Sequence, residues 1–271
     1  MPASVLLFDS GVGALSLVSA LDAALPGASL VYASDNAAHP YGTLDEAVLT
    51  SRVDRVLTEL TARYSPDLLI VACNTASTVA LPRLRSRLSV PVVGVVPAIK
   101  PAAAISRSGH IALLATPATV NRPYTQALID EFAPHCTVLR LGSLRLVELA
   151  EARLRGEPVA STELAAVLAP LFEDPRFERV DTAVLGCTHF PLLAAELAAA
   201  VPRPLTWVDS GEAVARRAAQ LLESAGASRT DNADRLAVFT GNGGEPARLA
   251  PALARFGFER AEVAELPFRR P

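Results

Sequence analysis

The chain has 271 residues with a formal net charge of −3, and 51% of them are hydrophobic while 20% are charged. This composition excludes a disordered chain and allows a substantial core in one large domain or two modest ones. The chain has no excess of positive charge, so nucleic acid is not expected as a partner. No apolar run is long enough to cross a membrane, so a membrane is not expected as a partner either. It also shows no signal-peptide pattern. We therefore expect a cytoplasmic protein whose three cysteines are thiols.

Short apolar runs alternate with amphipathic helical patterns along the whole chain. Strands are expected, in chain order, at 5–8, 30–32, 68–71, 111–114, 183–185 and 205–208. Helices are expected near 45–63, 119–131, 144–155, 190–200 and 212–224. The strands are rich in Leu and Val with little alternation, as in strands that are covered on both faces. The pattern predicts an α/β protein with mostly parallel sheets.

Polar residues come directly after several of these strands. The segments concerned are Asp9–Gly13, Cys73–Ser77, Thr116, Cys187–His189 and Asp209–Gly211. In an open α/β sheet, the carboxyl ends of the strands form the ligand crevice. The sequence therefore predicts that the functional groups lie in these turns.

Two of the turns are similar to each other, Leu-Ile-Val-Ala-Cys-Asn-Thr and Ala-Val-Leu-Gly-Cys-Thr-His, and they lie about one domain's length apart. This similarity indicates two related halves, each with a cysteine at the tip of a strand. A boundary is expected near the Pro-containing stretch 96–101, with a return crossing near 202–204.

A thiol just before a helix faces unpaired amide N–H groups, which stabilise its thiolate form. A free cysteine titrates near ~8.5, so a modest downward shift would make it a base or nucleophile at neutral pH. A single free cysteine is more often a small buried hydrophobe. Two cysteines in matching polar turns, Cys73 and Cys187, favour function, whereas Cys136 lacks such surroundings and is assigned to the core.

Other chemistries fit the sequence less well. No second metal ligand lies near Cys73 at the spacing of zinc sites, so no metal is expected. The sole lysine, Lys100, lies away from the polar strand ends, which argues against pyridoxal phosphate. No third glycine comes after Gly11 and Gly13 at dinucleotide-binding spacing. A cysteine hydrolase remains an alternative, although it leaves the second strand-end cysteine unexplained.

Two thiols suit a reaction in which one base removes a proton from a carbon acid and the other returns a proton on the opposite face. That reaction is a racemisation or an epimerisation, and it needs no cofactor.

Five motifs in order extend this interpretation. They are Asp9–Gly13, Pro40–Gly42, Cys73–Ser77, Gly186–Leu193 and Asp209–Gly211, and the similarity runs from residue 4 to about 225. Together they resemble the glutamate racemases of the aspartate/glutamate racemase family. The resemblance implies a cofactor-independent isomerase that interconverts L- and D-glutamate and supplies D-glutamate for peptidoglycan. An aspartate racemase or a cysteine amidohydrolase of similar fold remains the alternative.

The resemblance also implies an architecture. It predicts two similar α/β domains with the active site in the cleft between them, and dimers are usual in the family. The first domain is expected to comprise 1–96 together with 208–271, and the second to comprise 97–207.

The resemblance further assigns roles to residues at matching positions. Cys73 would take the α-proton of D-glutamate and Cys187 that of L-glutamate, with Asp9 and His189 as their polar assistants. The residues expected to bind the substrate are Asp9, Ser10, Tyr41, Gly42, Asn74, Thr75, Thr119, Thr188 and His189. Asp35 and Glu151 match acidic positions that line or border the site.

Simpler interpretations of some of these residues remain open. Asp9 could cap a helix, Tyr41 lies in an ordinary turn composition, and Glu151 falls on an amphipathic helix where glutamate is common. The matched motifs contain no arginine, so the substrate carboxylates are expected to bind backbone N–H groups and short polar side chains.

Overall fold

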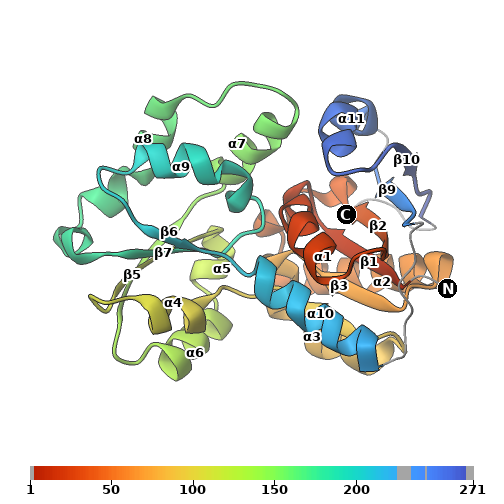
Figure 1. The fold of residues 1–271 in the computed structure, drawn as a ribbon, viewed down its shortest axis with the longest axis horizontal. Coiled ribbons are helices and arrows are strands. Elements are labelled where there is room, and N and C mark those ends of the chain that lie inside the picture. Colours follow the sequence, from red (N-terminus) through yellow and green to blue (C-terminus); the bar gives the residue numbers. More distant parts are fainter. Residues whose placement is uncertain (1–2, 225–232, 242, 267–271) are drawn as a thin grey trace. The chain divides into compact units, whose positions relative to one another are not determined.

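The computed structural model describes residues 3–224, 233–241 and 243–266, and its fold is drawn in Figure 1. The chain forms two compact units. The first comprises residues 1–95 and 211–271, and the second comprises residues 96–210. The end of the motif similarity near residue 225 lies outside the described residues.

The first unit is built on a six-stranded sheet in which every pairing is parallel. The strand order is β10 (Arg260–Val263), β9 (Arg235–Phe239), β2 (Ser29–Ser34), β1 (Ser4–Asp9), β3 (Leu68–Val71) and β4 (Val92–Gly94). All four residues of β3 are buried, as expected for a strand that is covered on both faces.

Helices connect these parallel strands. They are η1 (Gly13–Leu17), α1 (Val18–Ala24), η2 (Asn36–Ala38), η3 (Tyr41–Thr43), α2 (Glu46–Tyr64), α3 (Asn74–Arg87), α10 (Gly211–Ser224) and α11 (Glu245–Arg255). Asp45 caps α2, because its Oδ1 accepts hydrogen bonds from the backbone N–H groups of Ala47 and Val48.

The second unit has a four-stranded sheet, which is also parallel throughout. Its strand order is β6 (Thr137–Gly142), β5 (His110–Ala115), β7 (Thr182–Leu185) and β8 (Thr206–Val208). Its helices are α4 (Ile99–Ile105), α5 (Pro117–Val120), α6 (Pro123–Phe132), α7 (Arg145–Leu154), α8 (Ser161–Phe172), η4 (Pro175–Arg179), η5 (Phe190–Leu193) and α9 (Ala194–Ala200). The predicted α/β fold with parallel sheets is confirmed.

Two expected helices differ from the structure in their details. The helix expected at 119–131 is divided into α5 and α6, because Arg122 precedes Pro123 and takes an extended conformation (φ −70°, ψ 142°). The helix expected at 190–200 begins as the short 3-10 helix η5 and becomes α-helical only at Ala194.

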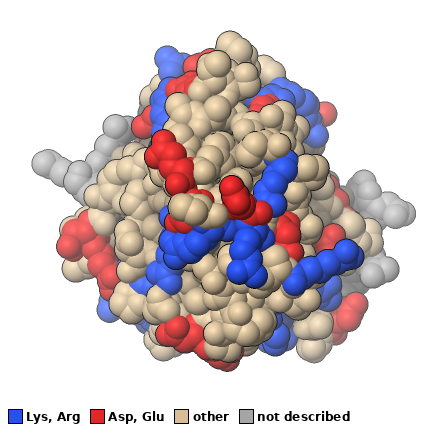
Figure 2. Space-filling model, turned by 90° about the vertical axis from the view of Figure 1, so that its left-hand side faces the viewer, with Lys and Arg blue, Asp and Glu red and all other residues tan. Residues whose placement is uncertain are grey.

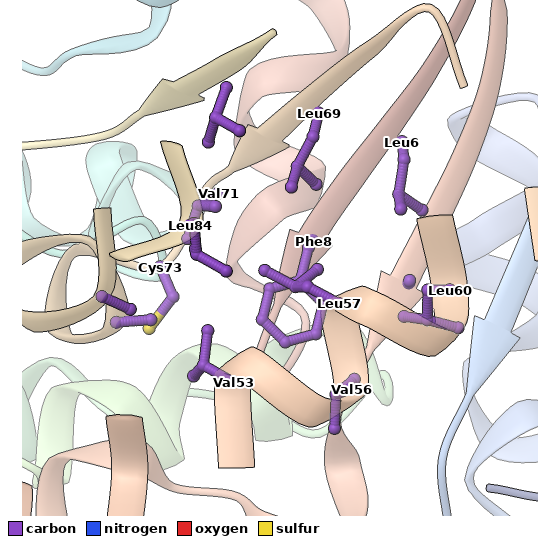
Figure 3. Packing of buried hydrophobic residues seen from close by; sticks show 14 of the residues in the cluster. Leu6, Phe8, Val53, Val56, Leu57, Leu60, Leu69, Val71, Cys73 and Leu84 are labelled. Atoms are coloured by element: carbon purple, nitrogen blue, oxygen red, sulfur yellow. The ribbon is translucent and has the colours of Figure 1, made fainter. Parts of the chain in front are cut away.

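The core of the first unit runs up to one of the two strand-end cysteines. Leucine, valine and phenylalanine side chains of β1, β3, α2 and α3 fill the space between sheet and helices. Cys73 lies at the margin of this cluster, beside Val71 and Leu84 in Figure 3. In the second unit, Cys187 belongs to a corresponding buried cluster that includes Leu114, Leu185 and Phe190. Each thiol is therefore held by packed apolar side chains.

Each sheet has one position at which the chain order reverses. In the first unit the chain passes from β1 outward to β2 on one side, and from β3 outward to β4 on the other, so the switch point lies between β1 and β3. In the second unit the corresponding position lies between β5 and β7. Ligands of open α/β sheets bind at such positions, outside the carboxyl ends of the strands.

Within the described ranges, none of the helices combines the length and the apolar composition needed to cross a lipid bilayer.

Candidate active site

The two strand-end cysteines occupy equivalent positions in their sheets. Ala72 N donates a hydrogen bond to Phe8 O across β3 and β1, and Gly186 N donates one to Leu114 O across β7 and β5, both at 2.7 Å. Cys73 and Cys187 are the next residues in each case. Both thiols therefore stand at the switch point of their own sheet, and both are 6% exposed. The internal similarity seen in the sequence corresponds to this shared placement.

Cys73 is the residue immediately before α3. It is the N-cap of that 14-residue helix, and its carbonyl oxygen accepts the N–H of Ser77 at 2.8 Å. The positive end of the helix dipole favours negative charge at this position, as the sequence predicts.

Asp9 and Ser10 link the end of β1 to this thiol. Asp9 is fully buried, and its Oδ1 accepts hydrogen bonds from Ser10 N at 2.6 Å and from Ser10 Oγ at 3.4 Å. Ser10 Oγ lies 3.9 Å from Cys73 Sγ. The hydroxyl therefore stands between the carboxylate and the sulfur.

Asn74 and Thr75 form the first turn of α3, and both are nearly fully buried. Within the described part of the chain, the buried Asn74 Oδ1 has no hydrogen-bond partner. A buried amide oxygen in this state can accept a hydrogen bond from a cationic or polar ligand.

The Asp35–Gly42 loop, which connects β2 to η3, carries three of the predicted residues. Tyr41 is 1% exposed, and its hydroxyl donates to Asp35 Oδ2 at 2.5 Å. Burial and the neighbouring Asp35 raise the pKa of Tyr41 well above its usual value, so the phenol remains a hydrogen-bond donor. Gly42 is partly exposed next to it.

Cys187 differs from Cys73 in the backbone that comes after it. A turn at Thr188 and His189 comes first and then the four-residue η5, so no α-helix begins at this cysteine. The expected helix N-terminus is therefore replaced by a tight turn. Gly186 allows the chain to approach β5 closely just before this turn, because a Cβ at this position would lie 2.9 Å from Leu113 Cδ1 and 3.2 Å from Leu114 O.

An imidazole and a carboxylate support Cys187. Its Sγ lies 3.8 Å from His189 Nδ1, and His189 Nε2 lies 2.9 Å from Glu151 Oε1 on α7. Both side chains are buried, and Arg155 Nη1 lies 3.4 Å from the other oxygen of Glu151. Because a carboxylate only accepts, it selects the tautomer with hydrogen on Nε2, which leaves the Nδ1 lone pair facing the thiol.

Hydroxyl groups line the same end of the second sheet. Thr116 comes after β5 and caps α5, and its Oγ1 donates to Thr119 Oγ1 at 2.9 Å. Thr119 is fully buried, and Thr188, which lies between Cys187 and His189 in the sequence, is 5% exposed. Cys136 is half-buried just before the neighbouring β6 and packs against the core.

The structure thus gathers the predicted residues into two groups, one in each unit. The first group is Asp9, Ser10, Asp35, Tyr41, Gly42, Cys73, Asn74 and Thr75, and the second is Thr119, Glu151, Cys187, Thr188 and His189.

Sequence reasoning missed Arg52 and Thr240, which both contact Asp35. The sequence does contain one indication that Arg52 is buried, because this residue lies on the apolar face of α2 between Leu49 and Val56. Thr240 comes after β9, a strand that was not predicted.

Comparisons with known proteins show the family of the chain. The family model for Asp/Glu/hydantoin racemase matches residues 15–218. The chain belongs to the Asp/Glu/hydantoin racemase family. A curated glutamate racemase of Klebsiella pneumoniae (strain 342) is 48% identical over 263 residues, which are 97% of this chain and 92% of that protein.

Solved structures of family members superpose on the chain. Escherichia coli glutamate racemase, in complex with L-glutamate and the activator UDP-MurNAc-Ala, has a TM-score of 0.90 at 47% identity and covers 97% of this chain and 98% of its own. Bacillus anthracis glutamate racemase has a TM-score of 0.83 at 26% identity and covers 99% of both chains. The predicted resemblance and the assignment of the chain as an isomerase are confirmed.

The face drawn in Figure 2 carries charges of both signs. On the face drawn in Figure 2, Lys and Arg side chains gather near the centre, with Asp and Glu side chains close to them. The absence of nucleic acid, metal and cofactor, the dimer, and the roles of the individual site residues remain predictions.

Proposed function

We propose that this chain racemises glutamate without a cofactor, with Cys73 and Cys187 as the two acid/base groups. The observation that carries the proposal is the equivalent placement of the two thiols, one residue beyond matching hydrogen bonds at the switch point of each sheet. The similarity to enzymes named glutamate racemase supports glutamate as the substrate.

The proton transfers balance without any co-reactant. Starting from D-glutamate, the Cys73 thiolate accepts the α-proton, and the electron pair of the Cα–H bond passes to the Cα carbanion. The Cys187 thiol then donates its proton to the opposite face of Cα and becomes a thiolate. Starting from L-glutamate, the two thiols exchange roles. Each turnover inverts the substrate and moves the negative charge from one sulfur to the other.

The groups behind each sulfur can take part in these transfers. His189 Nδ1 faces Cys187 and can accept the thiol proton, while Glu151 stabilises the imidazolium that results. Near Cys73 the helix dipole stabilises the thiolate, and the Ser10 hydroxyl stands between that sulfur and Asp9.

Short polar groups would hold the substrate. We assign substrate binding to the backbone at Tyr41 and Gly42, to Asn74 and Thr75 in the first unit, and to Thr119 and Thr188 in the second. The buried Asn74 Oδ1 suits the substrate ammonium, which is a donor only. Fixed dipoles of this kind stabilise the charge that develops at Cα more effectively than water does.

The product would serve peptidoglycan synthesis in the cytoplasm. The related E. coli enzyme was solved with the activator UDP-MurNAc-Ala, and N-acetylmuramic acid is a peptidoglycan sugar. The mechanism also requires reduced cysteines, which a reducing cytoplasm maintains.

The test is racemisation of each pure enantiomer in D₂O by the wild-type protein and by Cys73→Ser and Cys187→Ser. The wild type should convert both enantiomers and incorporate deuterium at Cα. Both serine variants should lose almost all racemisation, because a hydroxyl is a far weaker acid than a thiol and is not a base near neutral pH.

Cys136→Ser is the matched control, since it makes the same change at a half-buried cysteine of the core. It should retain racemase activity. Full activity of Cys187→Ser, or an equal loss in Cys136→Ser, would contradict the two-thiol mechanism, and conversion of aspartate alone would identify an aspartate racemase.

A cysteine amidohydrolase is the second candidate, and one specific observation favours it. The Cys187–His189–Glu151 series has the order of nucleophile, base and orienting acid that such enzymes use. This function predicts ammonia release from glutamine or asparagine that depends on Cys187 and survives Cys73→Ser.

A further inference from the structure

Asp35 is the centre of a buried hydrogen-bond network in the first unit. Its side chain is fully buried just beyond the end of β2. Oδ2 accepts from the Tyr41 hydroxyl at 2.5 Å and from Arg52 Nε at 2.9 Å. Oδ1 accepts from Arg52 Nη2 at 2.6 Å and from Thr240 Oγ1 at 2.5 Å.

These four hydrogen bonds fill the acceptor capacity of a carboxylate, which offers about four lone-pair sites. Asp35 therefore has no capacity left for a substrate ammonium or for an α-proton. Its partners are the Tyr41 side chain and two groups from other elements. This arrangement fits a residue that holds the loop in place.

Arg52 approaches from α2 and is only 6% exposed. It uses Nε and Nη2 together, so the pairing with Asp35 is bidentate and fixes the orientation of the carboxylate. A buried guanidinium on the apolar side of a helix is unfavourable unless it is paired in this way. A 19-residue helix is thereby tied to the Asp35–Gly42 loop.

Thr240 ties the same loop to the strand β9. Its hydroxyl donates to Asp35 and accepts the N–H of Ala37 at 3.3 Å. One residue on, Gly241 N donates to Asn36 Oδ1 at 2.7 Å, and Asn36 Nδ2 donates to Gly241 O at 3.2 Å. This segment lies beyond residue 218, where the match to the family model ends.

We propose that Arg52, Asp35 and Thr240 are positioning residues that hold the Tyr41–Gly42 backbone in its substrate-binding conformation. The inference rests on the proposed function, in which this backbone binds glutamate. The Tyr41 side chain is buried and donates to Asp35, so its contribution to binding comes through the main chain. The burial that raises the pKa of Tyr41 keeps the phenol protonated as the donor of this contact.

The proposal predicts a particular kinetic signature. A loop that binds the substrate without touching Cα stabilises the bound ground state and the transition state by the same amount. Displacement of this loop therefore raises KM and leaves kcat nearly unchanged. Because both enantiomers share the carboxylates and the ammonium, KM should rise for both. A merely structural role would instead reduce the fraction of folded enzyme, which lowers kcat at constant KM.

The experiment compares Thr240→Val, Arg52→Met and Arg52→Lys with the wild type in both directions of racemisation. Thr240→Val should raise KM about 5- to 30-fold for each enantiomer, as expected for the loss of the hydrogen bond to the Asp35 carboxylate and of the one from Ala37 N, and change kcat by less than about threefold. Arg52→Met should raise KM further. Arg52→Lys retains the positive charge but cannot form the bidentate pairing with Asp35. Its KM should therefore lie between that of Arg52→Met and that of the wild type.

Thr58→Val is the matched control, because it removes a threonine hydroxyl that donates to the Asp54 carbonyl within α2. Its KM should equal that of the wild type. An unchanged KM in Thr240→Val and Arg52→Met, or a KM that rises as much in Thr58→Val, would overturn the proposal.

Hydrogen exchange separates this inference from the proposed function. The amides of Thr43 and Leu44 donate to Pro40 O and Tyr41 O within the loop turn. They should exchange faster in Thr240→Val than in the wild type or Thr58→Val, whether or not glutamate is the substrate. If the wild type fails to racemise glutamate, the proposed function fails, and unchanged exchange in Thr240→Val would then overturn the positioning role as well.

Discussion

Cys73 and Cys187 occupy the same place in two parallel sheets, yet their polar surroundings differ. Cys73 precedes a 14-residue helix and faces a serine hydroxyl at 3.9 Å, with a carboxylate behind that hydroxyl. Cys187 precedes a turn and faces an imidazole at 3.8 Å, with a carboxylate behind that ring. In one unit the positive end of a helix dipole lies at the thiol, and in the other an ionisable side chain lies beside it.

The difference shows how a repeated backbone can carry two chemically distinct bases. Equivalent hydrogen bonds from Ala72 and Gly186 place the sulfurs. Their partners have different origins, because Ser10 reaches Cys73 from the end of β1, whereas His189 comes two residues after Cys187. A two-base racemase needs one group that begins as an acid and one that begins as a base, and unequal surroundings allow the two directions to be adjusted separately. Substitutions at either thiol's partners can therefore test this asymmetry.

Among substitutions of the groups beside the thiols, the largest effect is expected for His189→Asn. Removal of the imidazole deprives Cys187 of a titratable contact at Sγ, and general acid–base assistance contributes about 10²–10⁴-fold. The loss should be larger for L-glutamate, whose α-proton is assigned to Cys187. Initial rates at saturating concentrations of each enantiomer measure this as kcat, because an equilibrium constant of one makes kcat/KM fall equally in both directions. An equal loss of kcat in both directions would contradict the assignment.

Asp9→Asn should slow the enzyme less and with the opposite preference. Asparagine retains an acceptor for the Ser10 backbone N–H but lacks the negative charge near Cys73, and the helix dipole of α3 remains. We expect a loss of about 10- to 100-fold, mainly for D-glutamate. The same rate assay checks it, with Ser10→Ala showing how much of the effect passes through the hydroxyl. A greater loss for L-glutamate would show that Asp9 does not act on Cys73.

Glu151→Gln should have a smaller effect than His189→Asn. The amide still fits beside His189 Nε2 but no longer stabilises an imidazolium, so the rate with L-glutamate should fall about 10-fold. A pH–rate profile measures the change, because the acidic limb of the wild-type profile should move to lower pH in the variant. An unaltered profile would show that Glu151 only orients the ring.

The smallest effect concerns the support of β7, which leads to Cys187. Burial opposes ionisation of Asp181, but hydrogen bonds from Ser106, Ser108, Thr182 and Arg107 outweigh it and lower the pKa of Asp181 to about 2. Because the folded-state pKa lies below the unfolded value near ~3.9, this stabilisation is complete above about pH 5 and is lost as pH falls toward 2. Asp181→Asn should therefore destabilise the second unit by about 1 kcal/mol at neutral pH and by less in acid.

The single tryptophan makes this measurement possible. Trp207 lies on β8, opposite Ala183 of β7, so its fluorescence during denaturation reports on the second unit. The difference between wild type and Asp181→Asn should shrink between pH 5 and pH 2. A difference that is independent of pH would show that the ionised carboxylate is not the group that holds this strand.

Much of the fold could be predicted from the sequence because its signals are local. The six strands identified by apolar composition all exist, and α2, α7 and α10 match the predicted periodicity closely. The remaining strands were harder to identify. β6 and β10 alternate apolar with exposed or charged residues, and the three-residue β4 is too short to stand out. The apolar run of β9 after Arg235 was not identified.

Some features of the candidate site could likewise be predicted from the sequence, and others could not. The sequence by itself determined where the two thiols stand, since a cysteine two residues past a buried strand must lie at the carboxyl edge of a parallel sheet. The family resemblance predicted Asp9, His189 and Glu151 as further site residues. It could not determine which side chains these residues contact, because such contacts join segments that are distant in the chain.

Tertiary structure alone decided the partners of Asp35. Arg52 lies 17 residues away on a helix and Thr240 lies 205 residues away beyond β9, and their contact depends on the order of strands in the sheet. The burial of this network lets a saturated carboxylate hold the loop, and burial is a property of the assembled core. A local pattern of residue types therefore determined the reactive groups, whereas the packing of distant segments decided how they are held.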